Sequence, residues 1–287
     1  MKKTFRILLI FAYSQLRPRP RSLTPCPLPW QGRGSRAGRK RTHAGKLLAV
    51  AVLAVLLSGT LTAASAQENI LVLAGLGNTA YVPAKLFTPA LGMTPRYSYL
   101  ANALTGFVLD QPFPKKLEGL RGLELIVLAD VPASAFNGLM GRRALRQFVE
   151  IGQGLLVFGG PFALGKGELE DCAFEDALPV TTTGPWDLVK ADNPVVKVGK
   201  PSPITNGLHW EQKPVISYYQ KVIPKPGAEV LLKCGEAPLL VTGTYGEGRV
   251  AVFTGTYLEA AKGQTLIFDW PDYATMLGRL TWWLTQR

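Results

Sequence analysis

Cysteine and histidine are scarce in this chain. Its 287 residues include three cysteines and two histidines, and one of each, Cys26 and His43, lies before residue 67. The remainder therefore holds only Cys172, Cys234 and His209. A zinc site needs several such ligands at close spacing, so the sequence predicts no metal centre. The two cysteines could form one disulfide in an oxidising compartment or stay as two separate thiols, because the sequence does not supply their distance.

Acidic residues are absent from residues 1–66, which carry 12 of the 32 lysines and arginines. The rest of the chain balances 20 basic against 20 acidic residues, so its formal net charge is zero. A net charge of +12 would normally suggest a nucleic-acid partner. Because the excess lies in a segment that we expect to be removed, we predict that the protein does not bind nucleic acid.

No apolar run reaches the roughly 20 residues that span a bilayer. The longest run, residues 47–57, follows Lys46 and leads through small residues to Ala64-Ser65-Ala66. A basic flank, a short apolar core and an A-x-A end are typical of a secretory signal peptide. We therefore predict export to the periplasm or the extracellular space, with cleavage after Ala66. The alternative is an uncleaved segment that anchors the protein in the membrane.

These patterns divide the chain into three regions. Residues 1–45 are rich in Arg, Pro and Gly, and indicate either a disordered leader or a start codon assigned too far upstream. Residues 46–66 are the predicted signal peptide. Residues 68–287 are long enough to bury a sizeable core, and we expect them to form a single domain.

Residues 123–161 predict a strand, a helix and a second strand. The apolar runs 125–128 and 155–158 are typical of parallel strands buried on both faces. Helical spacing between them places one group of apolar residues on a common side, namely Met140, Ala144, Leu145, Phe148 and Ile151. Ligands of open α/β sheets bind at the carboxyl ends of the strands. Asp130, Gly159 and Gly160 lie at these ends and are therefore candidate ligand contacts.

The rest of the domain alternates strands, loops and helices. We expect strands at residues 69–74, 96–100, 195–198, 215–219, 229–233, 239–245 and 249–254, and helices at residues 168–178 and 273–284. A glycine turn follows the first strand, but Ala80 occupies the third position of the dinucleotide-binding spacing. The acidic residues between 168 and 176 lack the spacing of a calcium loop. We therefore predict no cofactor.

Several segments together resemble one known family. In chain order they are LADVPA, GQGLLVFGGPFALGKGELED, FEDALPV, ITNGLHW, KVIPKPGAEVLLK, PLLVTGTYGEGRVAVFTGT and FDWPDYATMLGRLTWWL. They look like the glutamine amidotransferase-like domains of the class I amidotransferase superfamily, over roughly residues 68 to 287. The resemblance implies a flavodoxin-like three-layer α/β/α sandwich. Its sheet would be mostly parallel, with added C-terminal β-hairpin strands and a final helix.

The resemblance does not extend to the nucleophile. Catalytic members place a cysteine in the tight turn after the strand that matches residues 155–158, and a His-x-Glu pair later in the chain. Here the turn reads Gly159-Gly160-Pro161-Phe162. We therefore expect a non-catalytic module of the cell envelope that binds a small ligand or a protein partner. Asp130 and these four turn residues are its candidate pocket.

A rearranged hydrolase site is the alternative hypothesis. His209 and Glu211 have the His-x-Glu spacing and could act with Asp130, although a partly exposed loop histidine without a catalytic role is the better explanation of His209. Cys172 is a poor nucleophile candidate, because the acidic residues around it would raise the pKa of its thiol. A purely structural domain is a third hypothesis.

Overall fold

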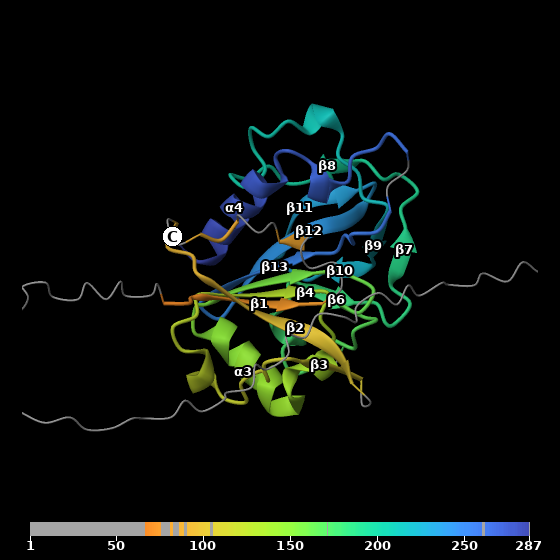
Figure 1. Cartoon of the computed structure of the whole chain (residues 1–287). Coiled ribbons are helices and arrows are strands. Elements are labelled where there is room, and N and C mark those ends of the chain that lie inside the picture. Colours follow the sequence, from red (N-terminus) through yellow and green to blue (C-terminus); the bar gives the residue numbers. More distant parts are fainter. Residues whose placement is uncertain are drawn as a thin grey trace, which may run out of the picture. The chain divides into compact units, whose positions relative to one another are not determined.

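The computed structural model describes residues 67–75, 81–82, 86–88, 91–103, 106–170, 172–259 and 262–286. The predicted leader and signal peptide lie outside these residues. Among the described residues, a nine-stranded sheet runs in the order β3-β2-β1-β4-β5-β13-β12-β11-β8 (Figure 1). Its strands are β1 (Ile70–Ala74), β2 (Pro95–Ala103), β3 (Gly106–Leu109), β4 (Leu125–Ala129), β5 (Gly154–Phe158), β8 (Val196–Val198), β11 (Glu229–Cys234), β12 (Ala237–Tyr245) and β13 (Gly248–Phe253).

The five neighbouring strands β2, β1, β4, β5 and β13 are parallel. Numbered along the chain, they lie in the order 2-1-3-4-5 that is typical of flavodoxin-like folds. The chain leaves β1 towards one edge of the sheet and returns to β4 on its other side, so the strand order reverses between β1 and β4. Ala74 of β1 pairs with Ala129 of β4. Gly75 and Asp130 therefore follow side by side at the point where such folds bind ligands.

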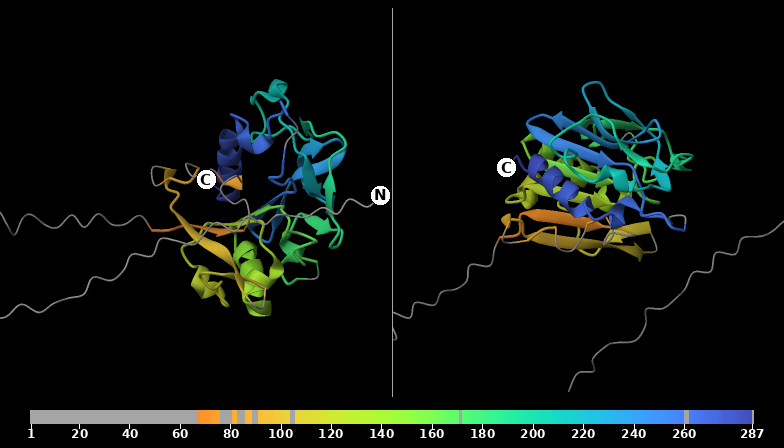
Figure 2. Two further views of the ribbon diagram at one scale, coloured as in Figure 1. Left: turned by 45° about the vertical axis from the view of Figure 1, so that its right-hand side comes forward. Right: turned by 90° about the horizontal axis from the view of Figure 1, so that it is seen from above.

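Helices cover both faces of this sheet. α3 (Gly138–Glu150) lies on one side of the strands and α4 (Tyr273–Leu284) on the other, as Figure 1 and the left view of Figure 2 show. Alternate residues of the central strands point to opposite faces: Val72 and Val127 pack in the core on the side of α4, and Leu71 in the core on the side of α3. This burial on both faces is the reason for the uninterrupted apolar runs. The predicted three-layer α/β fold is confirmed.

The remaining elements are short. Two small antiparallel sheets pair β6 (Val180–Thr182) with β10 (Val222–Pro224), and β7 (Leu188–Lys190) with β9 (Tyr218–Gln220). The 3-10 helices that lie wholly within the described residues are Leu117–Leu120, Ala133–Phe136, Glu175–Ala177, Trp210–Gln212 and Ile267–Asp269. No helix among the described residues is long and apolar enough to cross a membrane.

Three local predictions were wrong. The predicted strand 215–219 is reduced to an isolated bridge at Val215 and to β9, which begins at Tyr218. Residues 168–178 do not form an α-helix: Glu168 has a φ of 57°, in the left-handed region, and the hydrogen bonds that follow, such as the one from Glu175 N to Cys172 O, span three residues rather than four. The apolar side predicted for the helix α3 is also shorter in the structure, because the first and last of its residues are not buried. Met140 and Ile151 are exposed, and burial of that helix centres on Leu145 instead.

The two cysteines do not form a disulfide. Cys172 is buried in the core on the side of α3, whereas Cys234 is buried in the core on the side of α4. The sheet therefore lies between the two thiols, and the alternative of two separate thiols holds. Burial raises the pKa of the Cys172 thiol, and raises that of Cys234 to about 11. Neither is a poised nucleophile, because the reactive form of cysteine is the thiolate.

Candidate functional site

Asp130 lies at the carboxyl end of β4, next to β1, where the order of the strands reverses. It follows the last residue of β4, its φ is 57°, and its side chain is completely buried. The backbone N–H of Phe162 donates a hydrogen bond of 2.7 Å to Oδ1. The other carboxyl oxygen, Oδ2, is buried without a hydrogen-bond partner among the described residues. Leaving a buried acceptor unpaired costs roughly 1–3 kcal/mol, so this oxygen is a group that a donor on a ligand could satisfy.

Two glycines allow the chain to pass this close to Asp130. A Cβ atom added at Gly160 would lie 2.2 Å from the carboxyl carbon of Asp130. A Cβ atom added at Gly75 would lie 2.0 Å from the carbonyl oxygen of Asp130. Both distances are far below any real carbon contact, so only glycine fits at either position. The glycine residues after β1 and β5 thus allow the loops after these strands to approach Asp130, at its backbone oxygen and at its carboxyl group respectively.

The loop after β5 is held by a second buried polar group. Gln220 Oε1 accepts a hydrogen bond from Gly160 N at 3.0 Å, and Gln220 Nε2 donates to Ala163 O at 2.7 Å. The same Nε2 lies 3.0 Å from Oδ2 of Asp187, which accepts from Gly165 N at 2.9 Å. Leu188 of β7 pairs with Gln220 of β9, and this pairing brings the two polar side chains together. Residues 159–165 are therefore fixed in place by side chains from distant strands.

Burial raises the pKa of both acids. It raises the pKa of Asp130 to about 7, although the hydrogen bond from Phe162 N works in the opposite direction. Burial also raises the pKa of Asp187, against the hydrogen bonds from Gln220 and Gly165. A carboxyl group with a pKa near 7 can donate or accept a hydrogen bond at neutral pH. An acid with a pKa shifted as far as that of Asp130 is more frequent at functional sites than elsewhere.

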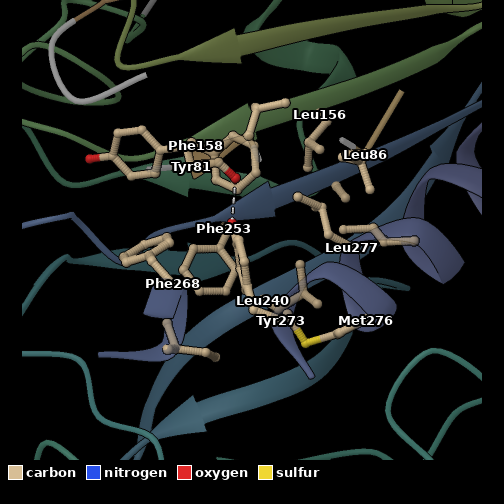
Figure 3. Packing of buried hydrophobic residues seen from close by; sticks show 14 of the residues in the cluster. Tyr81, Leu86, Leu156, Phe158, Leu240, Phe253, Phe268, Tyr273, Met276 and Leu277 are labelled. Atoms are coloured by element: carbon tan, nitrogen blue, oxygen red, sulfur yellow. Dashed lines mark hydrogen bonds between the residues drawn. The ribbon is translucent and has the colours of Figure 1, made fainter. Parts of the chain in front are cut away.

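Tyr81 belongs to the core on the side of α4 and interacts electrostatically with Asp130. Its ring packs against Phe158 and Phe268, and Figure 3 shows it among the aromatic side chains of this core. Tyr273 of α4 donates a 2.6 Å hydrogen bond to the backbone oxygen of Tyr81, drawn as a dashed line in Figure 3. Burial raises the pKa of the Tyr81 phenol well above its ordinary value, and the charge of Asp130 adds to this effect. Tyr81 is therefore a neutral group near the carboxylate.

His209 belongs to a different part of the domain. Its side chain is exposed, and Nδ1 lies 2.9 Å from Oδ2 of Asp272, the residue before α4. The hydrogen bond with Asp272 is the main reason why the pKa of His209 is raised, and Glu211 adds a smaller electrostatic effect. Among the described residues, this group shares no hydrogen-bonding partner with Asp130. The structure thus brings His209 and Glu211 near each other but gives His209 a partner, Asp272, that the sequence spacing did not indicate.

The turn residues lie where the sequence analysis placed them, but their partners were missed. Gly159, Gly160 and Phe162 all lie at the carboxyl end of β5, and Gly160 and Phe162 contact side chains from elsewhere in the chain. Gln220 and Asp187 lie in a segment whose composition suggested only strands and loops, and no motif marked them. No group of three or more possible metal ligands occurs among the described residues.

Strand order, glycine turns and a carboxyl-edge site define an α/β domain of the flavodoxin-like type. A family model described as "Putative glutamine amidotransferase" matches residues 84–286. The chain therefore belongs to this glutamine amidotransferase-like family, as its motifs indicated.

Solved structures agree with this fold. Cytoplasmic protein STM3548 from Salmonella typhimurium is 20% identical, with a TM-score of 0.62 over 75% of this chain and 98% of its own. Cytoplasmic protein STM1381 from Salmonella typhimurium LT2 is 21% identical, with a TM-score of 0.61 over 76% of this chain and 99% of its own. At these identities the similarity shows the fold alone. A search of curated proteins found no match.

Proposed function

We propose that this protein is an exported, non-catalytic member of the glutamine amidotransferase-like family that binds a small ligand or a protein partner in the cell envelope. One observation carries the proposal. The turn after β5, where catalytic members of the superfamily keep a cysteine, consists of Gly159, Gly160, Pro161 and Phe162. None of these side chains can attack an amide.

The surroundings of the turn support the same conclusion. A Cβ atom at Gly159 would lie 2.5 Å from Thr254 O, and Gly160 faces the Asp130 carboxyl group even more closely. A cysteine at either position would have to displace backbone or a buried side chain. The chain after Pro161 forms turns instead of a helix. The turn therefore has no adjacent helix N-terminus of the kind that lowers the pKa of catalytic cysteines.

A binding role draws its support from Asp130. A buried carboxyl group with a pKa of about 7 and an unpaired oxygen lies at the ligand edge of the sheet. Such a group favours a ligand with a hydrogen-bond donor, for example an amide or an amine. Export rests on the signal-peptide pattern of residues 46–66, which precedes the part that the family model matches.

Glutamine hydrolysis tests the non-catalytic role. Ammonia release from glutamine by the purified full chain should equal that of buffer alone. Release above this background would overturn the proposal. Release that survives His209→Ala would reveal a nucleophile elsewhere, and release lost in His209→Ala would favour the His209-centred candidate described below.

The binding role needs a separate measurement. A set of small amides, amines and organic acids should contain a compound that raises the unfolding temperature of the wild type but not of Asp130→Asn. The exposed Glu150→Gln serves as the matched control and should respond like the wild type. A compound that stabilises wild type and Asp130→Asn equally would place binding elsewhere, and a set without any stabilising compound would count against the binding role.

A hydrolase centred on His209 is the second candidate. The hydrogen bond between His209 Nδ1 and Asp272 Oδ2 favours it, because a general base is commonly oriented by a carboxylate in this way. The hypothesis stated from the sequence also includes Asp130 and Glu211 in this site. If it holds, ester or amide hydrolysis by the full chain should fall by at least about 100-fold in His209→Ala. Activity that is unchanged in His209→Ala and Glu211→Ala would exclude it.

A further inference from the structure

A cavity lies towards the amino ends of the parallel strands, opposite the carboxyl ends that carry Asp130. Its volume is about 640 Å³, which falls within the range of small-molecule sites. Arg249, in its wall, pairs with Gly154 at the beginning of β5, whereas the Asp130 site follows the carboxyl ends of the strands. The wall combines α4, the amino ends of β11 and β13, Thr242 of β12, and two loop segments around Leu86 and Pro203.

The walls of this cavity are mainly apolar. Met93, Ile204 and Leu231 are buried at its sides. Trp282 and Leu91 also line it and remain 55% and 59% exposed. Large exposed hydrophobic side chains around a cavity are typical of an entrance that accepts an apolar group.

Two arginines supply the charge of the cavity. Arg249 Nη1 donates to Trp283 O at 2.7 Å, and its guanidinium lies 5.4 Å from the centre of the Trp283 ring. Arg279 Nη1 donates to Asn206 O at 2.6 Å. Both guanidinium groups are thus held by backbone carbonyls, which are neutral. Each keeps further N–H donors beyond Nη1 with which to bind an anion.

The carboxylates nearby have other partners. Glu229 lines the cavity, and its Oε1 is hydrogen-bonded to Lys200 Nζ. Asp272 interacts electrostatically with Arg279, but its Oδ2 is hydrogen-bonded to His209. The described part of the cavity wall therefore carries an excess of positive charge. Arginine recognises a carboxylate with two parallel hydrogen bonds, which a compact cation does not provide.

We propose that this cavity binds a small amphipathic carboxylate, with its apolar body between the tryptophans of α4 and the buried aliphatic side chains. Its carboxylate binds the guanidinium of Arg279, assisted by Arg249. The proposed ligand resembles a medium-chain fatty acid in chemistry. This site is independent of the binding role assigned to Asp130, so either can fail alone.

Gly278 offers a direct way to block the cavity. It lies in α4, and among the described residues a Cβ atom added there would meet only Leu86 Cδ1, at 3.9 Å. Because Gly278 lines the cavity and its Cβ position is open, Gly278→Leu should place a bulky side chain in the cavity. Gly278→Ala is the matched control, because it changes the helix but adds a single methyl group. Replacing glycine in a helix interior also improves helix propensity, so neither variant should unfold the domain.

Displacement of the fluorescent probe 1-anilinonaphthalene-8-sulfonate from the full chain by decanoate measures binding, with decanol as the uncharged comparison. We expect decanoate to displace the probe from wild type and Gly278→Ala but not from Gly278→Leu. Arg279→Gln should weaken decanoate about tenfold or more and leave decanol unchanged. Arg143→Gln, an exposed arginine on α3, controls for overall charge and should behave as wild type.

The results that overturn the proposal are equally specific. Equal affinity for decanoate and decanol would exclude recognition of the carboxylate. Displacement that persists in Gly278→Leu would place the probe and the ligand outside this cavity, and no displacement from wild type would refute the ligand class. The comparison of decanoate with decanol in Arg279→Gln decides the question even if Gly278→Leu does not fold.

Discussion

Replacing Asp130 by asparagine should remove a large part of the pH dependence of stability. In the folded protein, burial raises the pKa of Asp130 to about 7, from 3.8 for an unperturbed aspartate. Between these two values the unfolded chain has already lost the proton that the folded chain keeps. The free energy of unfolding therefore falls progressively as the pH rises from about 4 to about 7, because the folded state keeps Asp130 from ionising.

The size of this effect follows from the two pKa values. Each unit of pKa difference corresponds to about 1.4 kcal/mol, so the full loss is about 4 kcal/mol. About 2 kcal/mol of it falls between pH 5 and pH 7, the range in which most proteins can be studied without acid unfolding. The free energy of unfolding of a typical domain is only about 5–15 kcal/mol, so this change is large. Asparagine has nearly the same shape and keeps the acceptor for Phe162 N, but it does not ionise.

Denaturant unfolding at pH 5, 6, 7 and 8 measures the effect. The difference in free energy of unfolding between Asp130→Asn and the wild type should grow in favour of the variant as the pH rises. Glu150→Gln, at an exposed position of α3, controls for the loss of one acidic group. A difference between Asp130→Asn and the wild type that stays constant from pH 5 to pH 8 would refute the reasoning. Asp130 would then be ionised across this range or equally accessible in both states.

Three further predictions concern other parts of the chain. Tyr273→Phe removes the hydrogen bond to the buried Tyr81 O and should lower the free energy of unfolding by about 1–2 kcal/mol; an unchanged denaturant midpoint would show that the carbonyl finds another donor. Cys172 and Cys234 should both react with a thiol reagent in denaturant without reductant. A disulfide between them would be seen by mass spectrometry, because neither cysteine would then carry the mass of the reagent. The exported protein should begin at Gln67, whereas a mature mass that includes residues 47–57 would favour the uncleaved anchor.

The strands of the sheet were the most predictable part of the fold. Residues 125–128 and 155–158 are apolar throughout, and the structure buries β4 and β5 completely. The reason is local: a strand covered on both faces has no position that favours a polar side chain. The C-terminal helix was predictable for a related reason, because its apolar residues repeat with the helical period and pack on one face of the sheet.

The segments between strands were less predictable, because contacts with distant residues decide them. Residues 168–178 have the composition of a helix, yet Leu169 and Phe174 are buried in irregular turns. In the same way, Met140 fits the helical stripe of α3 by spacing but lies beyond the edge of the sheet contact and is exposed. Tertiary packing overrides such weak local preferences.

The sequence by itself determined the layered α/β architecture, the family and the absence of a nucleophile in the turn at Gly159–Phe162, because each depends on residue types and on short-range spacing. Only the tertiary structure decided that Gly160 has no room for a side chain, that Cys172 and Cys234 lie on opposite faces of the sheet, and that Asp130 is buried with one unpaired oxygen. These features are distances between residues far apart in the chain. The packing of strands and loops sets those distances, and no local pattern encodes them.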